Sequence, residues 1–226
     1  MGGHMEETGT ATPELAAEER EGAPSHYQLL TPKDWFRIPL RDAEQRARSV
    51  QALIDLTMPS RDERAVQRRE LRDMLTTVTG TAAARDGIEM YLSTDAVLGV
   101  PVPATLLVSA EPGDPDPPVR LPVAWMADGV RDKHGPEAEV SVVRLPSGEA
   151  VRCRRQGTSE DTRELGQAAD RPNTLLDFYL PIPESGGWLI LTFSTPIPEL
   201  AQPLTELFDA IAGSLRWTQD VAVARG

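Results

Sequence analysis

The most apolar segment of this chain reads Gly187-Trp188-Leu189-Ile190-Leu191-Thr192-Phe193-Ser194 and is followed at once by Thr195-Pro196-Ile197-Pro198. The run from Trp188 to Ser194 has the length and the aromatic and branched residues of a buried strand. An amphipathic helix is predicted from Pro196 to Ser214. Its apolar face consists of Ile197, Leu200, Leu204, Leu207, Phe208, Ile211 and Leu215. This strand and helix predict the centre of the core.

The ends of this helix carry recognisable signals. Thr195 is a suitable cap, and prolines in the first turn remove N–H groups that would have no partner inside the helix. Pro203 leaves two alternatives, because an interior proline breaks one backbone hydrogen bond. Either the helix kinks there, or a regular helix begins at Pro203 after a looser turn over Ile197 to Gln202. Gly213 predicts the end.

The centre of the chain favours antiparallel strands. Alternating apolar residues around Met90 predict one strand, and five further strands are expected at Thr105–Ser109, Val119–Met126, Glu139–Leu145, Ala150–Arg154 and Leu176–Leu180. The last of these is predicted to pair with the Trp188–Ser194 strand. Exposed connections are expected at Glu111–Pro118 and, as a long mobile loop, at Gln156–Thr174.

The N-terminal half adds two short strands and two helices. We expect the strands His26–Leu30 and Trp35–Leu40 to form a hairpin or meander pair. A helix capped by Asp42 should end at Met58-Pro59. A second helix should open with the capping box Ser60-Arg61-Asp62-Glu63, turn Val66, Leu71, Met74, Leu75 and Val78 inward, and stop at Gly80.

Strands in a block with helices segregated toward the ends predict an α+β fold, in which an antiparallel β-sheet is packed by helices. The domain boundaries follow from composition. Residues 1–25 combine a Met1-Gly2-Gly3-His4-Met5 stretch typical of an expression-vector scar with a disordered acidic tail, residues 26–217 form a single domain, and residues 218–226 form a second disordered tail.

The charge of the chain excludes several classes of partner. With 226 residues and a net charge of −12, its long-range field repels nucleic acid and anionic lipid. Arginines at helical spacing from Arg64 to Arg72 alternate with acidic residues and indicate a solvated helix face. No apolar run is long enough for a membrane span.

The residue usage also bears on compartment and source. Cys153 is the only cysteine, so no intrachain disulfide can form and a cytoplasmic location is expected. A cell-envelope lipoprotein is the alternative if the natural N-terminus has been replaced. Lys33 and Lys133 are the only two lysines among 23 basic residues, a bias that indicates a high-GC bacterial gene.

Three segments carry a family resemblance: the aromatic-rich strand from Gly187 to Ser194, the helix closing with Phe208-Asp209-Ala210-Ile211-Ala212-Gly213-Ser214-Leu215-Arg216-Trp217, and the early strand Trp35-Phe36-Arg37-Ile38-Pro39-Leu40. Together they resemble the Mog1/PsbP-like proteins and their actinobacterial relatives of the LpqN type. The resemblance covers about residues 27 to 217. It implies an α/β/α sandwich in proteins that mostly act as binding or assembly factors. It supplies no catalytic residues. The Ser60–Thr79 helix and the proline-rich Glu111–Pro118 stretch depart from the pattern.

Candidate chemistry is sparse. Cys153 lies among Arg152, Arg154 and Arg155, which would lower a thiol pKa, but strand alternation sends Arg152 and Arg154 to the opposite face. We therefore interpret Cys153 as a buried, unreactive thiol. His26 and His134 have no metal-ligand spacing, and we interpret both as surface residues, His134 in a loop from Asp128 to Glu137.

Acidic residues offer no better site. Asp128, Asp132, Glu137 and Glu139 lie near glycines but without the spacing of a calcium loop, and Asp114 and Asp116 alternate with prolines in a spacer. No motif for a nucleotide, a nucleophilic serine or a zinc ion is found. We therefore predict no catalytic residues, no cofactor and no metal.

Three hypotheses of function remain open. The first is a non-catalytic module that binds an unidentified protein through one sheet face or its long loops. The second is a small-ligand-binding protein or enzyme with a pocket between the sheet and the helical pair, lined by Trp35, Trp125 or Trp188. The third is a lipoprotein that has lost its anchor. The oligomeric state is not predicted.

Overall fold

The computed structural model describes residues 26–58, 64–94, 96–97, 100–113, 120–157 and 173–218. Several predictions fall outside the described residues: the two terminal tails at 1–25 and 219–226, the capping box at 60–63, most of the 111–118 connection with Asp114 and Asp116, and most of the 156–174 loop.

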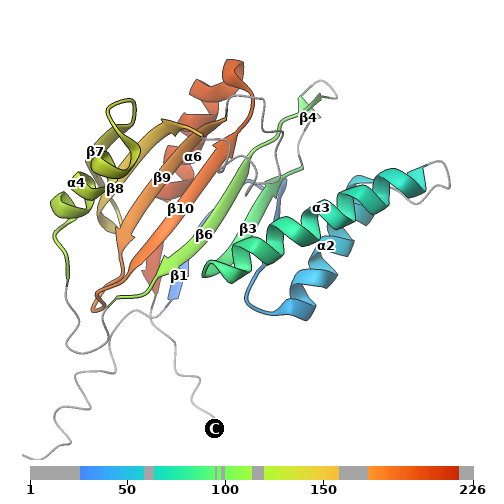
Figure 1. Cartoon of the computed structure of the whole chain (residues 1–226), viewed down its shortest axis with the longest axis horizontal. Helices are drawn as coiled ribbons and strands as arrows, with labels where there is room; N and C mark the ends of the chain where they lie inside the picture. Colours follow the sequence, from blue (N-terminus) through green and yellow to red (C-terminus); the bar gives the residue numbers. More distant parts are fainter. Residues whose placement is uncertain are drawn as a thin grey trace, which may run out of the picture.

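A seven-stranded, wholly antiparallel sheet forms the centre of the molecule (Figure 1). In spatial order its strands are β2 (Trp35–Pro39), β3 (Gly87–Ser93), β6 (Thr105–Glu111), β10 (Trp188–Thr195), β9 (Thr174–Pro181), β8 (Gly148–Gln156) and β7 (Glu139–Leu145). The predicted pairing of the Leu176 strand with the Trp188 strand is confirmed as β9 against β10. Two small two-stranded sheets accompany it, β1 (His26–Gln28) with β11 (Arg216–Thr218) and β4 (Ala96–Val97) with β5 (Val100–Pro101).

One face of the sheet carries a single continuous core. Leu189, Leu191 and Phe193 of β10 point to this face, and the helix α6 (Ala201–Gly213) covers them. The Phe208 ring stacks on Phe193 with ring centroids 4.8 Å apart, and meets Trp35 edge-on at 6.2 Å. The segment predicted as the centre of the core is therefore the centre of this face.

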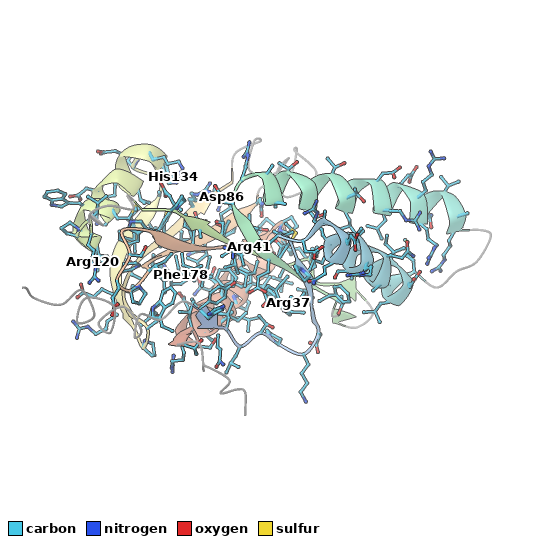
Figure 2. All side chains as sticks on the ribbon, turned by 90° about the horizontal axis from the view of Figure 1, so that it is seen from below. Arg37, Arg41, Asp86, Arg120, His134 and Phe178 are labelled. Atoms are coloured by element: carbon cyan, nitrogen blue, oxygen red, sulfur yellow. The ribbon has the colours of Figure 1, made fainter. Side chains whose placement is uncertain are left out.

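The opposite face is packed in two separate places. The helices α2 (Ala43–Thr57) and α3 (Ala65–Ala84) cover the β2 and β3 end, where Ile38, Leu53 and Ile54 are buried. The helix α4 (Val123–His134) covers the β7 and β8 end, where Val130 and Val151 are buried. Figure 1 shows α3 and α4 on the same side of the sheet with β10 and β9 exposed to view between them. Figure 2 sets His134 on that side and Phe178 of β9 on the other.

The structure confirms the predicted fold class, an α+β arrangement in which helices pack both faces of an antiparallel sheet. It also confirms local signals. The Asp42 carboxylate accepts hydrogen bonds from the N–H groups of Glu44 and Gln45, which caps α2 as expected. Gly213 is the last residue of α6.

The predicted strand at Val119–Met126 is wrong, and so is the loop from Asp128 to Glu137. Residues 123–134 form the helix α4, with Pro122 as its N-cap. Proline with fixed φ suits the start of a helix, and only Ala127 and Val130 of this helix are fully buried. The apolar residues before Ala127 have the pattern of a strand, because the buried face of α4 holds too few residues for a helical period to be recognised.

The predicted hairpin of the first two strands is also wrong. β1 pairs with β11, as in the register Tyr27 with Trp217, whereas β2 pairs with β3. Residues 216–217 are accordingly in a strand rather than at the end of the last helix. This pairing joins residues about 190 positions apart, so no local pattern announces it.

Two helix boundaries differ from expectation. α3 continues past Gly80 to Ala84, because Ala82 packs into the core there, and Val66 and Met74 are exposed rather than inward. Before α6, a short 3-10 turn (η2, Pro198–Leu200) replaces the first helical turn, so Pro203 lies near the start of the regular helix. The second alternative for Pro203 is therefore close to the structure.

Candidate functional site

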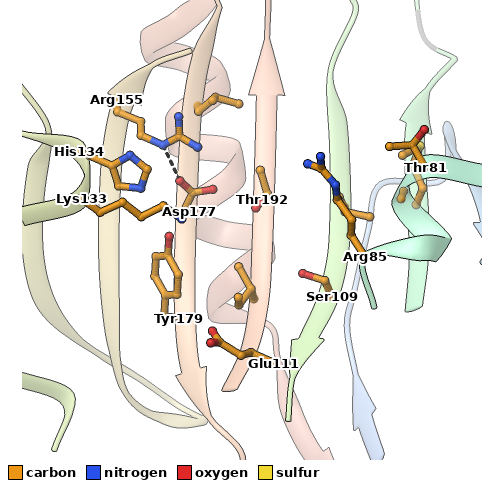
Figure 3. A pocket seen from close by; sticks show the side chains of 15 residues that line it. Thr81, Arg85, Ser109, Glu111, Lys133, His134, Arg155, Asp177, Tyr179 and Thr192 are labelled. Carbon is orange, nitrogen blue, oxygen red and sulfur yellow. Dashed lines mark hydrogen bonds and ion pairs between the residues drawn. The ribbon is translucent and has the colours of Figure 1, made fainter. Parts of the chain in front are cut away.

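The strip of sheet between α3 and α4 holds a hollow of about 240 Å³, which we call the sheet hollow (Figure 3). Its floor follows from strand register. Thr192 of β10 pairs with Asp177 of β9 on one side and with Leu107 of β6 on the other. Two residues along β10, Ile190 pairs with Tyr179 and Ser109. Directly paired residues point to the same face, so these side chains form two adjacent rows.

The two flanking helices supply the walls. Thr81, Ala82 and Arg85 come from the C-terminal end of α3, and Lys133 and His134 from the last turn of α4. Arg155 enters from β8, and Glu111 lies exposed at the end of β6. In Figure 3 the Arg85 side chain lies over β6, and Lys133 and His134 reach toward β9 from the opposite side.

A buried ion pair lies in the floor. The Arg155 Nε donates to an Asp177 carboxylate oxygen at 2.9 Å, and the side chains are only 12% and 2% exposed. Asp177 stands in a strand whose other residues are nearly all buried and apolar. Removing two charges from water is costly, and this cost is repaid only by good mutual geometry. A charged pair in such a position marks a candidate for function rather than an aid to stability.

The local charge of the sheet hollow is opposite in sign to that of the chain. Three cationic side chains, Arg85, Lys133 and Arg155, line it against the two carboxylates of Asp177 and Glu111. Lys133 forms no salt bridge with any carboxylate among the described residues. The whole chain carries −12. The lining of the sheet hollow is therefore locally richer in positive charge than the chain as a whole.

Hydroxyl groups complete the lining. Thr81, Ser109, Thr192 and Tyr179 offer donors and acceptors around the apolar side chains of the floor. Burial raises the pKa of the Tyr179 hydroxyl, and the Asp177 charge raises it further, so this phenol stays protonated in neutral solution. A neutral phenol can donate a hydrogen bond to a ligand oxygen.

Cys153 lies where the alternation predicted. It is fully buried under α4, facing away from Arg152, which instead binds Asp209 of α6 with 2.7 Å and 3.0 Å hydrogen bonds. Burial is the largest cause that raises the pKa of the Cys153 thiol to about 11, and the Asp177 charge adds to it. The interpretation as a buried, unreactive thiol is supported by both observations.

The other sequence candidates separate in space. His26 is exposed in β1, whereas His134 lines the sheet hollow, so His134 is not the loop residue expected. Asp128 and Asp132 lie on α4, and Asp128 pairs with Arg131 at 2.6 Å. Among the described residues, no three His, Cys, Asp or Glu side chains lie together in a way that could hold a metal ion.

The tryptophans do not line the sheet hollow. Trp35 and Trp188 are buried, and Trp125 is 66% exposed on α4. The predicted pocket was placed between the sheet and the helical pair, whereas the sheet hollow lies between α3 and α4 and is lined by both polar and apolar side chains. Sequence reasoning missed Asp177, Arg85 and Lys133. One signal was available: Asp177 is the one charged residue in the largely apolar strand Thr174–Pro181.

A second surface feature is apolar. A groove of about 710 Å³ runs along α2 and α3 beside the end of β3, and we call it the helical groove. Leu56 and Met74 line it with 61% and 42% of their surface exposed. Within the described residues, no helix is long and apolar enough to cross a membrane.

Comparison with known proteins finds distant structural likeness only. No family model matches the chain, and no curated protein matches it. Among solved structures, LpqN of Mycobacterium tuberculosis, described as involved in cell envelope biogenesis, is 12% identical over 84% of this chain and 81% of its own, with a TM-score of 0.40. A cyanobacterial PsbP from Synechocystis sp. PCC 6803 is 11% identical over 85% and 86%, with a TM-score of 0.39. These are the two kinds of protein that the sequence resemblance named. At such TM-scores the likeness supports no inference about the function or residues of this chain.

Proposed function

We propose that this protein is a non-catalytic binding protein and that its ligand is a small anionic molecule held in the sheet hollow. The observation that carries the proposal is the gathering of Arg85, Lys133 and the buried Arg155–Asp177 pair in one concavity of a strongly acidic chain. Concave sites with a few convergent polar groups are the usual form of small-molecule sites.

Size favours a small molecule over a macromolecule. A volume of about 240 Å³ corresponds to about eight waters at ~30 Å³ each. It accommodates a small organic acid or a single side chain. A partner protein presenting an acidic surface would be repelled by the net charge of −12, whereas a small anion meets mainly the local cations.

The sheet hollow offers binding groups rather than a nucleophile with its base. Ser109 shares the floor with Ile190 and Leu107, and the Asp177 carboxylate is held by Arg155. The Cys153 thiol is buried beneath α4. The groups around the ligand would therefore hold and orient it, which supports the non-catalytic part of the proposal.

A thermal-shift screen of anionic metabolites tests this function. Wild type should be stabilised by at least one anionic ligand, by about 2.7 kcal/mol at a hundred times its Kd. The variant Ser109→Phe fills the floor and should lose that stabilisation. Ser141→Phe, an equal change on exposed β7, should keep it. If no anion stabilises wild type, or if Ser109→Phe responds equally, the proposal is wrong.

Protein binding is the second candidate, and the helical groove favours it. Exposed Leu56 and Met74 form an apolar lining of the kind that receives an amphipathic helix. A lysate pull-down eluted in salt steps tests it. A stoichiometric partner retained by wild type, lost by Leu56→Asp with Met74→Asp and kept by Ser109→Phe, would assign protein binding to the helical groove.

The compartment is part of this proposal. A chain whose single thiol is buried and needs no disulfide suits the cytoplasm, where we place it. The cell envelope remains the alternative that the sequence left open. Fractionation of cells that express the complete gene distinguishes the two.

A further inference from the structure

We infer that the ligand of the sheet hollow is a small hydroxy acid, whose hydroxyl groups bind the polar oxygen atoms of the floor. This inference rests on the proposed function, which supplies the anionic group of the ligand, and it names the groups that separate this ligand from other small acids. Recognition of the hydroxyl groups comes from the oxygen atoms of the lining and not from its cations.

Four hydroxyl groups of the sheet hollow form no hydrogen bond with any residue that the structure describes. They belong to Thr81, Ser109, Tyr179 and Thr192. Threonines outside the hollow differ, since Thr79 donates to the Leu75 carbonyl and Thr205 to the Ala201 carbonyl, both at 2.7 Å. The four side chains are half-buried. Each can still donate one hydrogen bond and accept others, and a ligand can fill these positions.

The floor also holds a carboxylate oxygen that is open to a donor. One oxygen of Asp177 accepts from Arg155 at 2.9 Å, and the other accepts no hydrogen bond from a described residue. In Figure 3 the Asp177 side chain lies between Arg155 and Thr192. An ionised carboxylate only accepts hydrogen bonds. A ligand carboxylate would be repelled at this point, whereas a ligand hydroxyl donates to it.

Strand register sets these groups side by side. Asp177 and Thr192 are directly paired, and Ile190 of the next row pairs with Tyr179 on one side and with Ser109 on the other. Paired residues stand about 5 Å apart, and the next row on the same face lies about 7 Å further along the strand. A molecule of three or four carbons lying over Thr192 therefore reaches oxygen atoms of three strands.

This lining discriminates against an acid that has no hydroxyl group. Such an acid would place methylene groups against Asp177 and the hydroxyls of the floor, and these would lose water without gaining a partner. Sites that bind a ligand hydroxyl reject the analogue lacking it for this reason. The volume of about 240 Å³ also suits a molecule of this size.

Three acids of equal charge and equal chain length test the inference. Propionate, lactate and glycerate carry no, one and two hydroxyl groups, and the last two are used as separate enantiomers. NMR titration of the full chain measures each Kd. If each hydroxyl group gains one partner, affinity should rise about fivefold at each step. The better enantiomer of glycerate should then bind on the order of twentyfold more tightly than propionate.

Two variants remove a hydroxyl with little change of shape. Thr192→Val and Tyr179→Phe should each weaken glycerate binding about fivefold and leave propionate binding unchanged. The matched control is Thr76→Val, which makes the same change at an exposed position of α3 outside the sheet hollow and should bind all three acids as wild type does. Circular dichroism checks that each variant is folded.

The outcomes separate this inference from the proposed function. Equal affinity for the three acids would overturn the hydroxy acid and leave anion binding standing. Binding of none of them would also overturn it, and the metabolite screen would then decide the proposed function alone. Glycerate binding that is as tight in Thr192→Val and Tyr179→Phe as in Thr76→Val would remove these hydroxyls from the site. Glycerol bound as tightly as glycerate would overturn the anionic group, and with it the proposed function.

Discussion

Asp177 and Arg155 form an ion pair in the interior of the sheet, with a 2.9 Å hydrogen bond from Nε and a carboxylate that is 2% exposed. The two residues belong to neighbouring strands and lie in adjacent rows, since Arg155 pairs in register with Leu175. Their side chains therefore meet on a diagonal across the floor of the sheet hollow.

Removing one partner of this pair should be costly. Asp177→Asn leaves the guanidinium of Arg155 largely buried without the charge of Asp177, and a loss of about 3–5 kcal/mol in the free energy of unfolding is expected. Urea denaturation measures it. Asp177→Leu combined with Arg155→Met should lose much less, because no charge is then left buried.

The matched control is the exposed pair Arg144–Glu149, whose side chains are 84% and 55% exposed. Glu149→Gln should change stability by less than about 1 kcal/mol. If Asp177→Asn were as mild as this control, the floor of the sheet hollow would have to admit water to the guanidinium, and the interpretation of a buried pair would be wrong.

Phe208 is the side chain on which the core beneath α6 depends. It is fully buried, stacked on Phe193 and in edge contact with Trp35. Phe208→Ala should lower the free energy of unfolding by about 3–5 kcal/mol, and Ile211→Ala by about 2–5 kcal/mol. Gln202→Ala, on the exposed side of the same helix, is the control and should have little effect.

The core could be predicted from sequence because its signal is local. Leu189, Leu191 and Phe193 alternate along β10, and the helical spacing of Leu204, Phe208 and Ile211 follows directly after it. The alternation of the strand and the helical spacing that follows it are both complete within about 25 residues. The match between an apolar strand and an apolar stripe therefore predicted the packing of one on the other.

The opposite face was harder because its helices give weaker signals. α4 buries only Ala127 and Val130 fully, too few for a helical period to stand out among Val123, Trp125 and Met126. Because the first part of α4 was assigned to a strand and the part from Asp128 onward to a loop, Lys133 and His134 were not predicted to lie beside β9. The sheet hollow thus depends on an element that the local pattern concealed.

Long-range pairing was likewise beyond the sequence. Tyr27 pairs with Trp217, which lies near the other end of the chain. The residues of a strand do not by themselves indicate which other strand it will pair with. The alternation in β9 did show that Asp177 and Leu176 face opposite sides. Only the topology shows which of these two sides of the sheet is left uncovered between α3 and α4.

Tyr27 ties the small β1–β11 sheet to the main sheet. Its hydroxyl donates to a Glu89 carboxylate oxygen at 2.5 Å, and Arg37 donates to the other oxygen of the same group. Glu89 is only 5% exposed. Tyr27→Phe removes one donor from a buried carboxylate and should cost about 1–3 kcal/mol.

Urea denaturation of Tyr27→Phe measures this loss, and Gln28→Ala, at an exposed position of the same strand, is the control. Hydrogen exchange of the β1 and β11 amides should rise in Tyr27→Phe if the contact holds this sheet in place. Unchanged exchange with unchanged stability would show that Glu89 is satisfied by Arg37 alone.

Cys153 should make the protein less stable in alkali. Burial raises the pKa of its thiol from 9.0 to about 11 in the folded protein. Between these values the unfolded chain has lost the thiol proton and the folded protein retains it, so unfolding releases a proton and becomes more favourable as the pH rises. The stabilisation from the neutral thiol is present below pH 9 and is lost as the pH rises through the folded pKa.

Comparison of wild type with Cys153→Ala by urea denaturation from pH 8 upward separates the contribution of the Cys153 thiol from that of the tyrosine hydroxyls, which both proteins share. Wild type should lose up to ~1–3 kcal/mol more than the variant, and the native thiol should react with iodoacetamide far more slowly than the urea-unfolded thiol. Parallel pH profiles together with rapid labelling of the native protein would mean that solvent reaches Cys153 beneath α4.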